Sequence, residues 1–165
     1  MAAKKVFYSF YYKEDSSRIQ QVIQMGVVDG QAMLSGQKWE EVKKKGDPAV
    51  EKWIDEQMKG KNCLVVLVGS NTSTRPWVDY EIKKAWKDKL GVVGIRIHGL
   101  KDLNSQQTSA RGSSPFANLN LNGTPFANIV TLYDPPGSDS KAVYASISNN
   151  IEKLIEDAIK TRAKY

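Results

Sequence analysis

The chain has 165 residues, of which 41% are hydrophobic and 25% are charged, and it carries a net charge of +6. This length suits one compact domain, and this composition excludes a disordered, collagen-like or coiled-coil chain. No apolar run approaches the roughly 18–20 residues of a membrane-spanning helix, and the first ten residues lack a signal-peptide pattern, so we expect a cytoplasmic protein without a membrane partner.

The scarcity of two residue types excludes several chemistries. One cysteine and one histidine are too few for an intrachain disulfide or a zinc cluster, so we expect no metal site. Cys63 opens an apolar run and is interpreted as a small buried hydrophobe, while a general-base role for His98 is the less favoured interpretation. The lysines mostly alternate with acids, without a basic stripe interleaved with aromatics, so we expect no nucleic-acid partner.

Strand-like and helix-like segments alternate along the chain. Short β-branched or apolar runs between turn residues predict strands, and apolar residues three and four apart predict helices. The predicted strands are residues 5–10, either 27–28 or 32–34, 62–69, 91–97 and 129–133. The predicted helices are residues 16–25 after a cap at Asp15 or Ser16, 39–45, 48–59 after a cap at Asp47, 77–89, and a long closing helix that ends by residue 163.

This alternation predicts the fold class and the domain organisation. We expect an α/β, flavodoxin-like, doubly wound fold with a mainly parallel five-stranded sheet and helices on both faces. The prediction is a single domain over residues 1–165, with a core at 4–102, a long loop at 98–128, and a closing strand and helix at 129–163. Such sheets bind ligands beyond the carboxyl ends of their strands, so we expect a site in the loops after the first and third strands.

The stretch 98–128 is rich in Gly, Ser, Asn and Gln and contains two similar motifs, Pro115-Phe-Ala-Asn118 and Pro125-Phe-Ala-Asn128. We predict two similar turns, each with a buried phenylalanine, and no repeat architecture. A loop of roughly 30 residues is uncommon in a small domain and is usually functional or mobile. It is therefore a candidate lid.

The residues that could carry chemistry lie at two predicted strand ends. The chain contains no Gly-x-Gly-x-x-Gly, no phosphate-binding Gly-Lys-Ser/Thr loop and no Gly-x-Ser-x-Gly elbow, which disfavours hydride transfer, nucleotide hydrolysis and serine hydrolysis. The first strand is followed by Ser9-Phe-Tyr-Tyr12, and the helix after the third strand starts with Arg75-Pro-Trp-Val-Asp-Tyr-Glu81.

Glu81 lies at the boundary of a predicted helical face. Trp77 and Glu81 are four residues apart and share one helical ridge beside the apolar face. Glu81 could be a surface acid that favours the helix dipole and pairs with Lys84, with Trp77 as a boundary packing residue. The alternative is that both residues belong to a site.

A family resemblance is carried by residues 6–10, 39–44, 46–47, 53–54, 66–82 and 94–98. The most specific element is Ser/Thr followed by Arg75-x-Trp77-x-x-x-Glu81-Ile82. Together these segments, over roughly residues 4–102, resemble the bacterial TIR-like family, and within it the TIR-like proteins of Thoeris anti-phage defence systems.

The resemblance implies an enzyme of the NAD nucleosidase or ADP-ribosyl cyclase type. Such an enzyme cleaves the nicotinamide–ribose bond of NAD, its substrate, needs no cofactor, and releases a cyclic or otherwise modified ADP-ribose as a second messenger for a separate effector. The resemblance implies that Glu81 is the essential carboxylate and that Trp77 lies near the heterocyclic base of the substrate. It implies further that the substrate pocket is lined by Ser9, Phe10 and Tyr11. It also implies self-association on activation.

Two other functions are weighed against this one. TIR-like domains also serve as non-catalytic interaction adaptors, which is the alternative interpretation of the same resemblance. A flavodoxin-like phospho-receiver or nucleotide-binding domain is disfavoured, because a receiver needs clustered acids at its strand ends and these ends carry Ser-Phe-Tyr and Gly-Ser-Asn.

Overall fold

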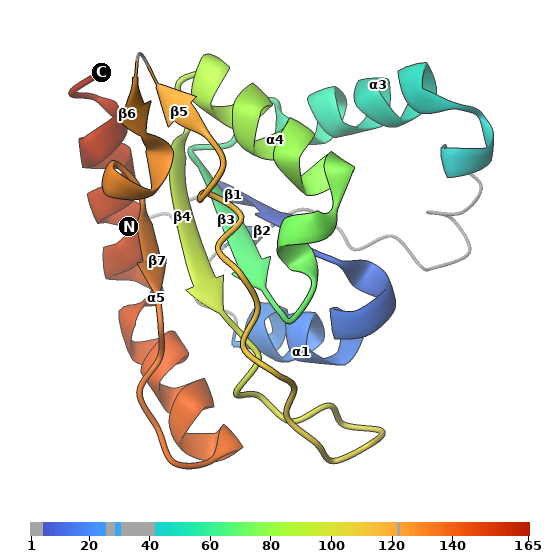
Figure 1. The fold of residues 1–165 in the computed structure, drawn as a ribbon, viewed down its shortest axis with the longest axis vertical. Helices are drawn as coiled ribbons and strands as arrows, with labels where there is room; N and C mark the ends of the chain where they lie inside the picture. The colour runs from blue at the N-terminus through green and yellow to red at the C-terminus, as the bar shows by residue number, and fades with distance from the viewer. Residues whose placement is uncertain (1–4, 26–28, 31–41, 122) are drawn as a thin grey trace.

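The structure, a computed structural model, describes residues 5–25, 29–30, 42–121 and 123–165 (Figure 1). In chain order its elements are β1 (Lys5–Ser9), α1 (Tyr12–Gln24), β2 (Asp29–Gly30), α3 (Asp47–Met58), β3 (Cys63–Val68), the 3-10 helix η1 (Thr72–Thr74), α4 (Pro76–Lys87), β4 (Gly91–Arg96), β5 (Asn120–Leu121), β6 (Thr124–Pro125), the 3-10 helix η2 (Phe126–Asn128), β7 (Thr131–Tyr133) and α5 (Ser140–Arg162). Within those ranges, no helix combines the length and the apolar character needed to cross a bilayer.

Five strands form one parallel sheet in the order β2-β1-β3-β4-β7. This is the strand order of a flavodoxin-like doubly wound sheet, so the predicted fold class is confirmed. All six residues of β3 are buried, as predicted for a central strand covered on both faces. The order reverses between β1 and β3, and ligands of such sheets bind beyond the carboxyl ends of the strands at this switch point.

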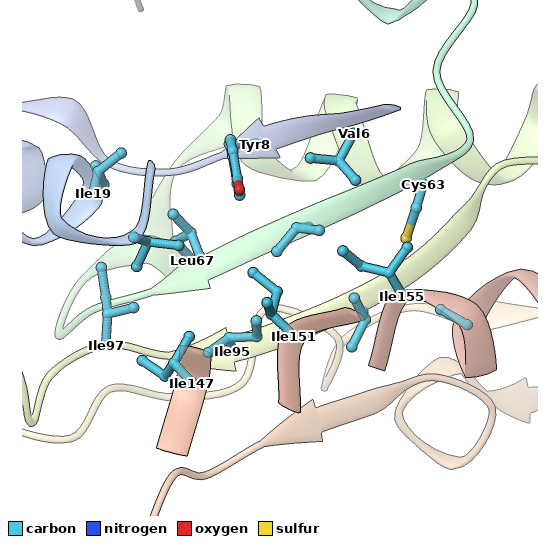
Figure 2. Close-up of a cluster of buried hydrophobic side chains, with 14 of the residues drawn as sticks. Val6, Tyr8, Ile19, Cys63, Leu67, Ile95, Ile97, Ile147, Ile151 and Ile155 are labelled. Atoms are coloured by element: carbon cyan, nitrogen blue, oxygen red, sulfur yellow. The ribbon is translucent and has the colours of Figure 1, made fainter. Parts of the chain in front are cut away.

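Helices α1 and α5 cover one face of the sheet. Alternate strand residues, among them Val6, Tyr8 and Leu67, point toward this face because side chains along a strand alternate between faces. Figure 2 shows these side chains meeting Ile19 of α1 and Ile151 of α5 in one apolar layer. Cys63 belongs to the same layer and is fully buried, as predicted.

Helices α3 and α4 cover the opposite face, together with residues that follow β4 in the chain. Ile54 of α3 and Ile82 of α4 pack on Phe7 and Val66 of the strands. Among the described residues between β4 and β7 there is no α-helix, only the short 3-10 helix η2, and Phe116 and Phe126 join this apolar cluster. Both phenylalanines are buried, which confirms the prediction made from the two Pro-Phe-Ala-Asn motifs.

The segment 98–128 extends beyond the carboxyl ends of the strands and then returns along the sheet to the β5–β6 hairpin (Figure 1). Hydrogen bonds hold it in several places. Arg18 donates to the carbonyl oxygens of Leu100 at 2.8 Å and Gln107 at 2.9 Å, and Ser70 Oγ donates to Ala110 O at 2.5 Å. A role as a lid stays a prediction, and any opening would have to break these bonds.

Three predicted helix starts are wrong, and that of α4 differs by one residue, since the helix begins at Pro76 and not at residue 77. Helix α1 begins at Tyr12, before the predicted cap at Asp15 or Ser16, and the Asp15 side chain is buried against Gly69 and bonded to Arg18 Nη1 at 3.3 Å. Asp15 therefore serves tertiary packing and not capping. Helix α3 begins at Asp47, one residue early, because Gly46 takes the cap position with a φ of 95° that glycine readily adopts.

Two further predictions fall partly outside the described residues. The alternative strands 27–28 and 32–34 both lie there, and the structure has β2 at Asp29–Gly30. Of the predicted helix at 39–45, residues 42–44 are helical and residues 39–41 are not described.

Candidate active site

A direct hydrogen bond joins the first strand to helix α4 at the switch point of the sheet. Ser9, the last residue of β1, donates its hydroxyl to Glu81 Oε1 at 2.7 Å. Glu81 is 7% exposed and Ser9 is 1% exposed, so the bond is shielded from water. The predicted alternative of a surface acid paired with Lys84 is wrong, because Lys84 Nζ pairs with Asp88 Oδ2 at 2.9 Å.

Burial controls the protonation of Glu81. It raises the pKa of the carboxyl group to about 8, and the hydrogen bond from Ser9 lowers that pKa only in part. Among the described residues, no lysine or arginine forms an ion pair with Glu81. A carboxyl group of this kind is neutral near pH 7 in the free protein and ionises when a cation binds beside it.

A contact between an aromatic and a basic side chain also joins the end of β1 to the start of α4. The Arg75 guanidinium, at the residue before α4, lies 4.4 Å from the centre of the Tyr11 ring. Trp77 is partly buried against the α3–α4 layer and meets Tyr80 edge to face at 5.5 Å between ring centres. Arg75 stands in the sequence motif, but nothing in the sequence assigned it a partner, because its contact to Tyr11 depends on the fold.

Phe10 is the predicted pocket residue that lies apart from the others. It packs against the α1–α5 layer, whereas Glu81 and Trp77 belong to α4 on the opposite face. The alternation of side chains beyond Ser9 explains this separation. The structure therefore brings Ser9 to Glu81 and Tyr11 to Arg75, and it turns Phe10 toward the other layer.

The segments that build this site have counterparts in known proteins. Residues 7–102 match the sequence model of the family described as "Thoeris protein ThsB, TIR-like domain". The chain belongs to this family. It is also 29% identical over 140 residues, which is 82% of this chain and 72% of the relative, to "Putative cyclic ADP-D-ribose synthase ThsB1" of Bacillus cereus (strain MSX-D12).

The ThsB TIR-like match confirms the predicted resemblance and extends from β1 to just beyond β4. Ser9, Tyr11, Arg75, Trp77 and Glu81 all lie within it. The family match therefore covers the switch point, and it ends at residue 102, before most of the residues between β4 and β7.

We expect Ser9→Ala to raise the pKa of Glu81 by roughly half a unit to one unit, because the variant loses a hydrogen bond that favours the charged form. The measurement is a ¹³C NMR titration of the glutamate carboxyl carbons, in which a Glu81→Gln spectrum identifies the Glu81 signal. Ser70→Ala is the control, since Ser70 bonds to Ala110. An unchanged or lowered pKa would contradict the prediction.

We also expect Glu81 to make this ThsB TIR-like domain less stable as pH rises. The folded pKa of about 8 exceeds the ordinary value of 4.5, so the folded state binds the extra proton between these values and stability falls with pH across that window. Between pH 5.5 and 7.5 the contribution is about 2 kcal/mol. The difference in unfolding free energy between wild type and Glu81→Gln isolates it, and a difference that does not change with pH would refute it.

Proposed function

We propose that this chain binds NAD at the Ser9–Glu81 switch point, cleaves the nicotinamide–ribose bond and releases a cyclic ADP-ribose that signals to a separate effector. The observation that carries the proposal is a buried glutamate at the carboxyl end of the sheet, bonded to Ser9 and without a basic partner among the described residues. Family membership and a relative named as a cyclic ADP-D-ribose synthase support it.

The proposed chemistry uses the charge of Glu81. The nicotinamide–ribose unit of NAD is a cation, so its binding beside Glu81 favours the carboxylate and lowers the pKa from about 8. When the bond breaks, its electron pair leaves with neutral nicotinamide and positive charge develops on the ribose, as in glycoside cleavage. A carboxylate in a water-poor site stabilises this charge more strongly than it would in water.

The second half of the reaction decides the product. If an adenine or ribose atom of the same molecule attacks the ribose carbon and releases a proton, the product is cyclic. If a water molecule attacks and releases a proton, the product is ADP-ribose. The choice depends on positioning and on the exclusion of water, which a chain segment over the carboxyl ends of the strands could provide.

The test is mass spectrometry of small molecules after purified protein is incubated with NAD, with the Glu81→Gln protein as the blank. Free nicotinamide together with a product lighter than ADP-ribose by one water would support the cyclase, and ADP-ribose would identify a nucleosidase. The proposal would be overturned if the wild-type chain did not turn over NAD but self-associated, and if Glu81→Gln self-associated equally well. This result would favour the adaptor alternative.

A further inference from the structure

A second group of polar side chains lies at the carboxyl ends of β4 and β7, which are on the other side of β3 from Ser9. A pocket of about 280 Å³ is lined there by Arg96 and His98 at the end of β4, and by residues 134–137 of the turn that leads from β7 into α5. The proposed function uses none of these residues.

Arg96 brings a positive charge to this pocket without an ion pair of its own among the described residues. It is 7% exposed, and its Nη1 donates to the carbonyl oxygen of Gly112 at 2.6 Å. Among the described residues no carboxylate pairs with it, because Asp134 in the pocket wall pairs with Arg111 at 2.7 Å. Burial and the nearby Arg111 lower the pKa of Arg96, while Asp134 raises it in part. An anion bound beside Arg96 would act in the same direction as Asp134.

His98 supplies a neutral hydrogen-bond donor. Burial lowers its pKa, as do the cations Arg96, Arg111 and Arg18, while Asp134 acts in the opposite direction. Its Nδ1 is buried and has no hydrogen-bond partner among the described residues. Because an unpaired buried N–H is rare and costly, the neutral ring carries its proton on Nε2.

We propose that this pocket binds the phosphate group of a small phosphate monoester. A guanidinium with free donors and an imidazole N–H suit phosphate oxygens, and Arg111 offsets the charge of Asp134. Pro135 and Pro136 add an apolar wall for the organic part of the ester. The volume lies just below the roughly 300–1,000 Å³ of sites for drug-sized ligands, which suits a small ester.

The pocket is separate from the proposed NAD site. The carbonyl of Ala110 accepts a hydrogen bond from Ser70, and Gly112 lies so close to the chain after β3 that an added Cβ would be 2.3 Å from Gly69 O. Residues 110–112 therefore cover the carboxyl end of β3, which lies between the two sites in the order of the sheet.

The decisive test is an NMR titration of His98, whose ring signals are unique because it is the only histidine of the chain. The untagged full chain is titrated with inorganic phosphate, ribose 5-phosphate and acetate, with sodium chloride at equal ionic strength as the reference. We expect saturable shifts with both phosphates, tighter binding of the ester, and a higher His98 pKa. Shifts no larger than those with chloride would overturn the proposal. Binding of inorganic phosphate without binding of ribose 5-phosphate would overturn the assignment of a monoester as the ligand.

Variants separate this pocket from general charge effects. Arg96→Gln should weaken phosphate binding by about tenfold or more, whereas Lys101→Gln, which removes the same charge from an exposed position nearby, should not. If Arg96→Gln does not fold, Asp134→Asn takes its place as the test variant, because Asp134 is exposed. This substitution removes a negative charge from the pocket wall, so it should tighten phosphate binding several-fold. Unchanged or weaker binding by Asp134→Asn would refute the assignment. Binding should persist in Glu81→Gln whether or not NAD is turned over.

Discussion

Glu81→Gln is expected to lower kcat/KM for NAD by about 100- to 1000-fold, the loss typical when one electrostatic group that stabilises a transition state is removed. Glutamine keeps the size of the side chain and an oxygen that can accept the hydrogen bond from Ser9, which is 2.7 Å long in the wild type. It removes only the negative charge. The loss should therefore fall on kcat as well as on kcat/KM.

The measurement is steady-state release of nicotinamide by wild type, Glu81→Gln and Glu152→Gln. Glu152 is an exposed residue of α5, so its variant loses the same charge and should keep full activity. For the wild type, kcat/KM should rise with pH up to about 8 and then level off, because Glu81 must be ionised to act. Turnover by Glu81→Gln within tenfold of wild type would remove Glu81 from the reaction.

Phe116→Ala is expected to destabilise the fold by about 3–5 kcal/mol, the usual loss when a buried phenylalanine is truncated. Phe116 is fully buried, lies 5.9 Å from Phe126 between ring centres, and covers Gly94 so closely that an added Cβ there would be 2.9 Å from the ring. The described residues between β4 and β7 form no α-helix, so side chains such as Phe116 cover this part of the sheet.

Chemical denaturation of wild type, Phe116→Ala and Leu103→Ala measures this effect. Leu103 is 59% exposed in the same long segment, so its truncation should change stability by less than about 0.5 kcal/mol. A loss below about 1 kcal/mol for Phe116→Ala would mean that the segment does not replace a helix as part of the core.

Local patterns predicted the fold, but they did not predict the starts of α1, α3 and α4. A parallel sheet was predicted from the apolar run of residues 62–69 and from the alternation of strands with helices. A strand that is buried on both faces has a continuous apolar sequence, which can be recognised directly. The start of α1 was missed because Asp15 has the composition of a cap, and its actual place beside Gly69 depends on contacts 54 positions apart in the chain.

The candidate site was predicted as a set of residues and not as an arrangement. Helical periodicity placed Glu81 at the boundary of a face and allowed two partners, Lys84 or a site. The hydrogen bond from Ser9 joins residues 72 positions apart, and no local pattern encodes such a distance. The separation of Phe10 from Glu81 could have been found from the alternation of side chains along the first strand.

The inert thiol of Cys63 makes site-specific labelling straightforward. Cys63 is the only cysteine of the chain, is fully buried, and burial raises its pKa to about 12, so it does not supply the thiolate that alkylating dyes require. One cysteine introduced at exposed Leu103 would be the single reactive thiol. A fluorophore or spin label there could report motion of the chain beyond β4 without any change to the core.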